Sequence, residues 1–143
     1  MSEVTEPETT KRGSTRTKAR KRALDILFEA DLRAMPIDEI LAAHVAENTP
    51  PVRDFTVSLV EGVAAETDTL DALISDALAT GWTLSRMPRV DRNLARLALW
   101  EMRASEIDSA IIIAEYVSLA DGLSTDDSAT FLNGVLGRLG AGR

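Results

Sequence analysis

Hydrophobic residues recur at helical spacing in the stretch from Asp108 to Leu139. In its first half, Ile112 and Tyr116 lie four residues apart and Leu119 follows three residues later, so all three share one face of a helix. The second half carries a wider stripe of large residues, namely Phe131, Leu132, Val135, Leu136 and Leu139. The stretch therefore predicts two consecutive helices joined by a short polar turn.

Glycine and capping residues set the expected bounds of these two helices. Gly122 follows the first apolar run and suits the left-handed conformation that ends many helices. Ser124 or Asp126 can cap the second helix, where an acidic residue also favours the helix dipole. Gly134 and Gly137 lie inside the second helix, which reflects either close approach of another backbone or loose selection.

Similar patterns predict five further helices in the rest of the chain. Prolines delimit three of them, because Pro36 cannot continue the first helix, Pro51 precedes the third, and Pro88 suits the first position of the fifth. Thr67 is a candidate cap for the fourth helix, which ends at Gly81. From the N-terminus, the five helices are expected over residues 16–35, 37–47, 52–66, 67–80 and 88–103.

The fold class that follows is all-α, because no segment shows the alternation of a half-buried strand. With 143 residues and 45% apolar content, we expect a single compact domain of about seven helices in one or two small bundles. Residues 1–15 are polar and are expected to form a disordered tail, continuing into a flexible basic arm. The helical domain is then residues 16–143, with sub-bundles at residues 16–81 and 82–143 if there are two.

Charge is unevenly distributed along the chain, whose formal total is −7. Residues 23–143 hold 9 basic and 20 acidic residues, a net charge of −11. Residues 11–22, which we call the basic arm, contain no acid and seven basic residues: Lys11, Arg12, Arg16, Lys18, Arg20, Lys21 and Arg22. An acidic body with a basic arm predicts that a polyanion binds the arm and that a basic partner suits the body.

The basic arm can neutralise the phosphates of a nucleic acid, and arginine can also stack on unpaired bases. The alternative is a solvated tail that only keeps the protein soluble. Seven charges in so short a segment of an acidic protein favour nucleic-acid binding, although the residues do not distinguish RNA from DNA. We select Arg16, Lys18, Arg20 and Arg22 as the main contacts, with Lys11, Arg12 and Lys21 adding positive field.

Other function classes find little support. The chain has no cysteine, which excludes disulfides and thiolate metal sites, and it shows no apolar leader or membrane-length segment. We therefore expect a cytoplasmic protein without a membrane partner. No phosphate loop, metal-ligand spacing or nucleophile beside a base is visible, so we expect no enzyme, no metal and no cofactor. His44 is expected to be a partly buried structural residue, and Trp82 and Trp100 to pack in the core or at its rim.

Three blocks of residues resemble the NusB family of transcription antitermination proteins. They are Ala19-Arg20, Ala23-Leu24 and Leu27-Phe28 in the first helix, Arg92–Met102 in the fifth, and Ala114–Ala120, Asp127-Ser128 and Phe131–Leu136 in the last pair. The spacing within the last pair also fits the family. Together the blocks extend over most of the chain, from Lys18 to Leu139.

The resemblance implies an RNA-binding adaptor in transcription antitermination. Members of that family bind the boxA element of ribosomal RNA transcripts, as single-stranded RNA, together with the ribosomal protein NusE, and they act with other Nus factors and RNA polymerase. For this chain, the resemblance assigns the basic arm, Asp127 and Phe131 to RNA binding. It assigns Phe28, Asp91 and again Asp127 to partner binding. A homodimer is also compatible with the family, and the sequence does not decide it.

Two alternatives remain open, one from the residues and one from the resemblance, because NusB-like domains also occur in rRNA methyltransferases. A helical protein-interaction module would bind its partner even with the charges of the basic arm neutralised. A stand-alone RNA-binding domain related to rRNA methyltransferases would share the fold without a cofactor-binding α/β domain.

The predicted fifth helix also carries a stripe of four arginines. Arg96 and Arg103 are expected to pair with carboxylates or to face solvent. An RNA contact stays open for Arg89 and Arg92.

Overall fold

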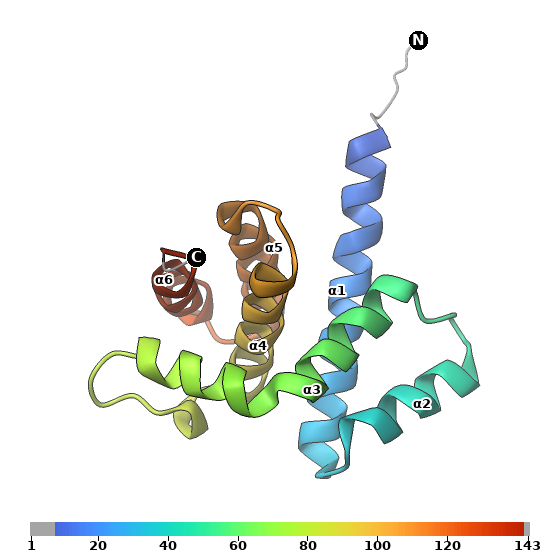
Figure 1. Cartoon of the computed structure of the whole chain (residues 1–143), viewed down its shortest axis with the longest axis horizontal. Coiled ribbons are helices and arrows are strands. Elements are labelled where there is room, and N and C mark those ends of the chain that lie inside the picture. Colours follow the sequence, from blue (N-terminus) through green and yellow to red (C-terminus); the bar gives the residue numbers. More distant parts are fainter. Residues whose placement is uncertain (1–7, 142–143) are drawn as a thin grey trace.

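The computed structural model describes the backbone of residues 8–141 and the side chains of residues 15–141. All regular structure in this range is helical, as predicted (Figure 1). The elements are α1 (Glu8–Arg33), α2 (Ile37–Glu47), α3 (Asp54–Ala77), the 3-10 turn η1 (Leu84–Arg86), α4 (Arg89–Ala104), α5 (Ser109–Leu123) and α6 (Ser128–Ala141). None of the helices in the described range combines the length and apolar character that a bilayer crossing needs.

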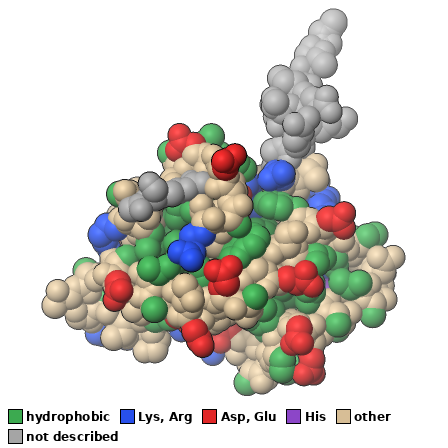
Figure 2. All heavy atoms as spheres, in the orientation of Figure 1, with side chains coloured by type: hydrophobic (Ala, Val, Ile, Leu, Met, Phe, Trp, Pro, Cys, Tyr) green, Lys and Arg blue, Asp and Glu red, His purple; other side chains and the backbone are tan. Residues whose placement is uncertain are grey.

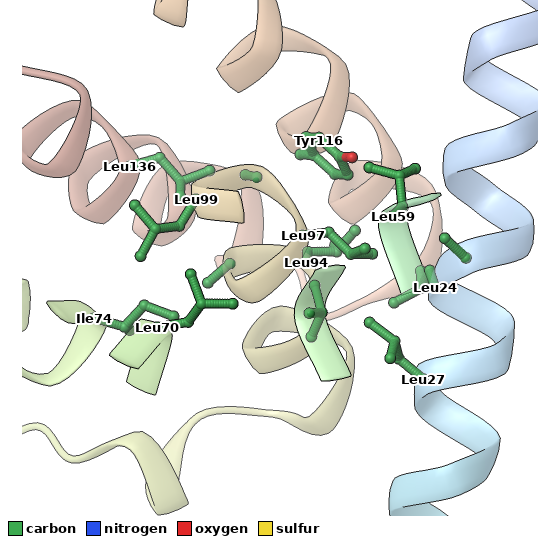
Figure 3. Close-up of a cluster of buried hydrophobic side chains, with 14 of the residues drawn as sticks. Leu24, Leu27, Leu59, Leu70, Ile74, Leu94, Leu97, Leu99, Tyr116 and Leu136 are labelled. Carbon is green, nitrogen blue, oxygen red and sulfur yellow. The ribbon is translucent and has the colours of Figure 1, made fainter. Parts of the chain in front are cut away.

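Helix α4 packs against most of the other helices. It contacts α1, α3, α5 and α6, and its residues Leu94, Leu97 and Ala98 are fully buried. Figure 3 shows the side chains that meet around α4, including Leu24, Leu27, Leu59, Leu70, Ile74, Tyr116 and Leu136. Burying one such leucine stabilises the fold by about 1.5–3 kcal/mol, so this shared core holds the helices in place.

Helix α1 differs from its expected bounds at both ends. It begins at Glu8, directly after Pro7, so residues 8–15 of the expected tail are helical, and residues 1–7 lie outside the described range. At its other end the helix stops at Arg33, before the expected Met35. Ala34 adopts a left-handed conformation with φ of 54°, and the Met35 amide donates to the Ala30 carbonyl at 3.0 Å. This pair of features is a Schellman-type helix end.

Helix α3 corresponds to the two helices that were expected on either side of Thr67. It runs continuously through a kink at Glu66, whose φ and ψ are −124° and 18°. Thr67 does not cap a new helix, because its hydroxyl donates to the Val63 carbonyl of the preceding turn at 2.7 Å. Such a bond back to the preceding turn tends to bend a helix. The prediction of two segments was thus close, and the kink joins them into one helix.

The C-terminal pair follows the predicted order with shifted ends. Asp108 caps α5 by accepting from the Ala110 amide at 2.9 Å. The helix continues past Gly122 to Leu123, so this glycine does not end it. In α6, a Cβ added at Gly137 would meet nothing within 4 Å, and at Gly134 only the end of the Arg138 side chain, at 3.8 Å. The close-approach explanation for these two glycines is therefore wrong.

A different glycine allows close packing between two helices. A Cβ built on Gly62 of α3 would overlap the Trp100 ring of α4. The Trp100 indole also donates to Glu66 Oε2 at 3.2 Å, which fixes the ring beside the kink. Gly62 is therefore required where α3 crosses α4, since any larger residue would displace the indole.

We expect Gly62→Ala to lower the free energy of unfolding by about 1–3 kcal/mol, because the added methyl group overlaps the Trp100 ring. The matched control is Gly137→Ala, which adds the same group to an open helix position and should stabilise the protein by about 1 kcal/mol. Urea unfolding followed by circular dichroism measures both. Effects of the same sign at the two positions would contradict the packing described for Gly62.

Candidate nucleic-acid interface

The described part of the basic arm lies in α1, whose N-terminal part extends beyond the other helices (Figure 1). Arg16 and Lys18 are exposed. The Arg16 guanidinium lies over the Phe55 ring of α3, 4.5 Å from its centroid, in a cation–π arrangement that steadies an otherwise mobile side chain. The side chains of Lys11 and Arg12 lie outside the described residues. Arg16 and Lys18 therefore form the accessible cationic surface of the described arm.

Arg20 differs from its prediction as a phosphate contact. Its side chain is only 4% exposed and donates two hydrogen bonds to Glu101 of α4, at 2.9 and 2.7 Å. A third bond, at 2.9 Å, reaches Glu115 of α5, and the Tyr116 hydroxyl donates to the same Glu101 carboxylate at 2.7 Å. The prediction is therefore corrected: the donors of Arg20 are used inside the fold. Its position three residues before Ala23 and seven before Leu27 was the sequence signal of an inward face.

Burial changes the ionisation of this network. Burial alone would lower the pKa of Arg20, but the hydrogen bonds and charge of Glu101 outweigh it and raise that pKa. Burial, followed by the nearby charge of Glu101, raises the pKa of Tyr116 well above its usual value. Arg20 thus stays charged and Tyr116 stays neutral, which preserves donors for the Glu101 carboxylate, itself only 2% exposed.

The last two residues of the basic arm, Lys21 and Arg22, both contact other residues of the protein. Lys21 forms an exposed ion pair with Asp25, one turn along α1, and such pairs contribute little to stability. Arg22 donates to His44 Nδ1 and to the Pro50 carbonyl, both at 3.3 Å. His44 also contacts Glu29 at 2.8 Å and is half-buried, which confirms its structural role. Arg22 therefore joins α1 to α2 and to the loop after it.

A second cluster of predicted residues surrounds the start of α6. Phe131 packs against Trp82 with ring centroids 5.2 Å apart, and Trp82 is 46% exposed. Beside them, Ser128 donates to Asp91 Oδ2 at 2.7 Å, and Asp91 is 1% exposed. The resulting pocket of about 240 Å³ is lined by Trp82, Pro88, Asp91, Thr125, Asp127, Ser128 and Phe131. Asp127 is exposed and accessible to a ligand, whereas Asp91 is placed to hold the start of α6.

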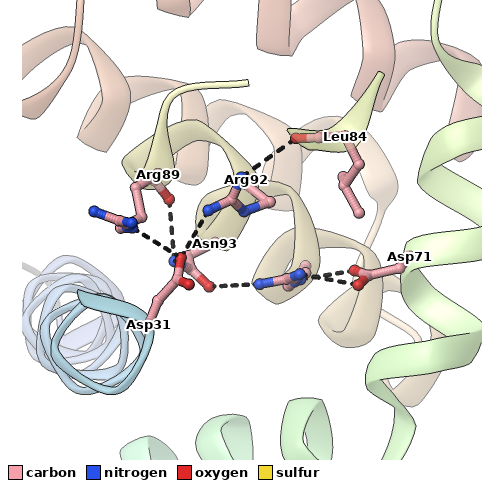
Figure 4. Close-up of polar contacts among 7 residues, drawn as sticks. Asp31, Asp71, Leu84, Arg89, Arg92 and Asn93 are labelled. Carbon is pink, nitrogen blue, oxygen red and sulfur yellow. Dashed lines mark hydrogen bonds and ion pairs between the residues drawn. The ribbon is translucent and has the colours of Figure 1, made fainter. Parts of the chain in front are cut away.

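The arginine stripe of α4 pairs with carboxylates on neighbouring helices. Arg92 and Arg89 both reach Asp31 of α1, at 2.9 and 3.4 Å (Figure 4). Arg96 holds Asp71 of α3 through two bonds of 2.7 and 2.9 Å, as expected for a structural residue. Arg103 is 46% exposed and lies 3.9 Å from Glu66. Arg89 is 43% exposed and keeps the accessibility that an RNA contact would need.

Comparison with known proteins identifies the family of this fold and site. A sequence model of the NusB family matches residues 17–140. This chain belongs to the NusB family. Transcription antitermination protein NusB of Salinispora tropica is 56% identical over 128 residues, which cover 87% of this chain and 93% of that protein. T. maritima NusB is 27% identical, with a TM-score of 0.78 over 88% of this chain and 90% of that one. A further chain of the same fold comes from a crystal structure of antitermination factors NusB and NusE in complex with dsRNA. It is 24% identical, with a TM-score of 0.78 over 90% of this chain and 97% of that one.

The NusB fold brings together some of the predicted residues and separates others. Asp91, Asp127 and Phe131 share one pocket, whereas Arg16 and Lys18 lie on α1 beside Phe55. Phe28 is half-buried on α1, outside the main cluster of buried side chains, and its partner role stays a prediction. Trp82 was predicted only to pack, yet its exposed ring forms part of the surface beside Phe131. Its place in the loop before Pro88 carried no periodic signal that could have shown this.

We expect Arg20→Gln to lower the free energy of unfolding by about 3–5 kcal/mol, because it leaves the buried Glu101 carboxylate without its cation. Arg16→Gln removes the same charge one turn away and should cost less than about 1 kcal/mol, since Arg16 is exposed. Urea unfolding at pH 7 measures both variants. Equal losses would contradict the distinction between a buried Arg20 that holds Glu101 and an exposed Arg16 one turn away.

The ion pairs of Asp31 predict a dependence of stability on pH. Burial would raise the pKa of Asp31, but hydrogen bonding and charge from Arg92 and Arg89 lower it overall. The carboxylate therefore stabilises the fold above its unfolded pKa of about 3.9, and this stabilisation is lost as pH falls through the lower folded pKa. Asp31→Asn should thus be most destabilising at pH 7, with a difference from wild type that shrinks below about pH 4. Urea unfolding from pH 7 to below pH 4 tests this, with Asp25→Asn at an exposed position of α1 as the control. A difference in free energy of unfolding between wild type and Asp31→Asn that does not change with pH would contradict a role for these ion pairs.

Proposed function

We propose that this NusB protein is an RNA-binding antitermination factor that holds boxA-type single-stranded RNA of ribosomal RNA transcripts together with NusE. The observation that carries the proposal is the exposed pair Arg16 and Lys18 on a helix that extends beyond the body. A rigid helical arm presents cations at fixed spacing, which suits a phosphate backbone. The acidic body would repel RNA elsewhere, so binding concentrates at the arm.

The surface around Trp82 and Phe131 suits unpaired bases. Sequence-specific recognition of RNA commonly targets single-stranded segments whose bases stack on aromatic side chains. Trp82 is half-exposed and Arg86 lies over its ring, 5.5 Å from the centroid. We infer that RNA bound along α1 by its phosphates places a base near this surface, with Asp127 available to accept hydrogen bonds from it. The phosphate contacts supply affinity, and the base contacts supply sequence preference.

NusE is the partner that the family relationship favours. A NusB of the same fold has been crystallised with NusE and double-stranded RNA. In this chain the net charge of −11 over residues 23–143 suits a basic protein partner. We propose that Phe28 and Asp127 contact NusE directly. Asp91 is buried, so we propose that it acts by holding Ser128 and the start of α6. The complex would then act with other Nus factors and RNA polymerase.

We expect the double variant Arg16→Gln/Lys18→Gln to bind a labelled boxA-type RNA more weakly and with less dependence on salt. If each residue neutralises one phosphate, the slope of log affinity against log salt falls by about 1.4, from about 0.7 per contact with single-stranded RNA. Fluorescence anisotropy over a salt series, with and without NusE, measures this.

The matched control is Arg103→Gln/Arg138→Gln, which removes the same charge from exposed positions on α4 and α6. It should leave the salt slope unchanged. Equal slopes for all three proteins would overturn the assignment of RNA to the basic arm. Equal affinity of wild type for boxA-type RNA and a scrambled RNA, even with NusE, would overturn the boxA proposal itself.

A further inference from the structure

A groove between α2 and α3 lies apart from every residue assigned to RNA or NusE above. The two helices are joined by residues 48–53, and α2 contacts α3 (Figure 1). Between them is a groove of about 380 Å³, lined by Ile37, Asp38, Leu41, Ala42, Val45 and Ala46 of α2 and by Val57, Val60, Glu61 and Ala64 of α3. The lining is apolar except for one carboxylate from each helix.

The groove has the shape that a third helix needs. Val60 is fully buried and Leu41 is 7% exposed, so they form the floor. Val45 is 47% exposed, although an aliphatic side chain gains by leaving water. Along the rims, Ala42, Ala46 and Ala64 carry only a methyl group. Small residues at these positions allow another helix to approach to the usual packing distance of about 8–10 Å.

The negative charge around the groove favours a positively charged occupant. Its lining contains Asp38 and Glu61 and no Lys or Arg. Over residues 37–68, which include α2 and the first half of α3, the sequence has seven acidic residues and one arginine, a net charge of −6. Figure 2 shows hydrophobic and acidic side chains side by side over this part of the molecule. An acidic rim around an apolar floor complements a helix with an apolar stripe flanked by Lys and Arg.

We propose that this groove docks a basic amphipathic helix of a partner protein. Helix α2 has 11 residues and is about 16 Å long, so the occupant would contribute about three turns. Its apolar residues would recur at i, i+3, i+4 and i+7 and contact Leu41, Val45 and Val57. Its basic residues would flank this stripe and face Asp38 and Glu61. Residues 1–7 of the chain itself do not fit, since they contain two glutamates and no Lys or Arg.

The test uses the full chain and a synthetic peptide of leucine and lysine, about four turns long, with leucines at the helical spacing. A peptide of the same composition in scrambled order controls for charge attraction to the acidic body. Fluorescence anisotropy gives the affinity, and amide chemical shifts locate the peptide on the protein. We expect the amphipathic peptide to bind more tightly than the scrambled one and to shift the amides of α2 and the first half of α3.

Two exposed alanines on the same helix give a matched pair of variants. Ala42→Arg places a guanidinium in the groove, whereas Ala43→Arg adds the same charge outside the groove lining. We expect Ala42→Arg to weaken peptide binding by at least about tenfold and Ala43→Arg by less than about twofold. Similarly, Glu61→Gln should reduce the affinity and its salt dependence more than Glu39→Gln, which lies outside the lining. All four positions are exposed, so the variants should fold, and wild-type circular dichroism and urea unfolding of Ala42→Arg would verify this.

Three results would overturn the proposal. The first is equal affinity for the amphipathic and scrambled peptides, and the second is an equal effect of Ala42→Arg and Ala43→Arg. The third is a wild-type dimer in sedimentation velocity that Ala42→Arg dissociates and Ala43→Arg does not, because the groove would then hold a second copy. None of these depends on RNA binding, so the groove and the RNA function succeed or fail separately.

Discussion

The buried ion pair between Arg20 of α1 and Glu101 of α4 is the interaction on which the presentation of the basic arm depends. Taking both charges out of water costs several kcal/mol per ion, so the pair persists only because its geometry is good and its remaining acceptor sites are used. Two bonds from Arg20 and one from Tyr116 satisfy Glu101, and a further bond ties Arg20 to Glu115 of α5. These contacts fix the rotation of α1 about its axis, which turns Lys18 toward solvent. Arg16 lies one turn before Arg20 on the same face and is exposed because α1 extends beyond the other helices there.

Other polar contacts of arginine side chains also hold helices together. Asp31 and Asp71 hold arginines of α4 from two sides, and Arg22 joins α1 to α2. Arg92 and Arg96 of α4 therefore hold helices together, whereas Arg16 and Lys18 of the basic arm are exposed. The acidic and apolar surfaces are elsewhere, around the start of α6 and between α2 and α3. Separate surfaces of this kind suit an adaptor that brings RNA and proteins together.

Helical periodicity predicted the fold well, because every helix here buries one apolar stripe against the same core. The bounds of α2 were predicted to the residue, since Pro36 and Asn48 delimit it in the sequence. The need for Gly62 was not predictable, because it depends on Trp100, more than thirty residues further along the chain. Arg20 shows the same limit for the site. Composition counted it with the other basic residues, its spacing from Ala23 and Leu27 indicated an inward face, and the structure then identified Glu101 as its partner.

We propose that Arg20 stabilises the fold, whereas Arg16 and Lys18 contact RNA. The most direct test is the triple variant Arg20→Met/Glu101→Leu/Tyr116→Phe, which replaces the buried polar network by apolar groups and leaves net charge unchanged. Replacing a buried ion pair in this way often preserves stability. Provided that the variant folds with wild-type circular dichroism, its affinity for boxA-type RNA at fixed salt should stay within about twofold of wild type. A loss as large as that caused by Arg16→Gln would show that Arg20 contacts RNA and would contradict the account.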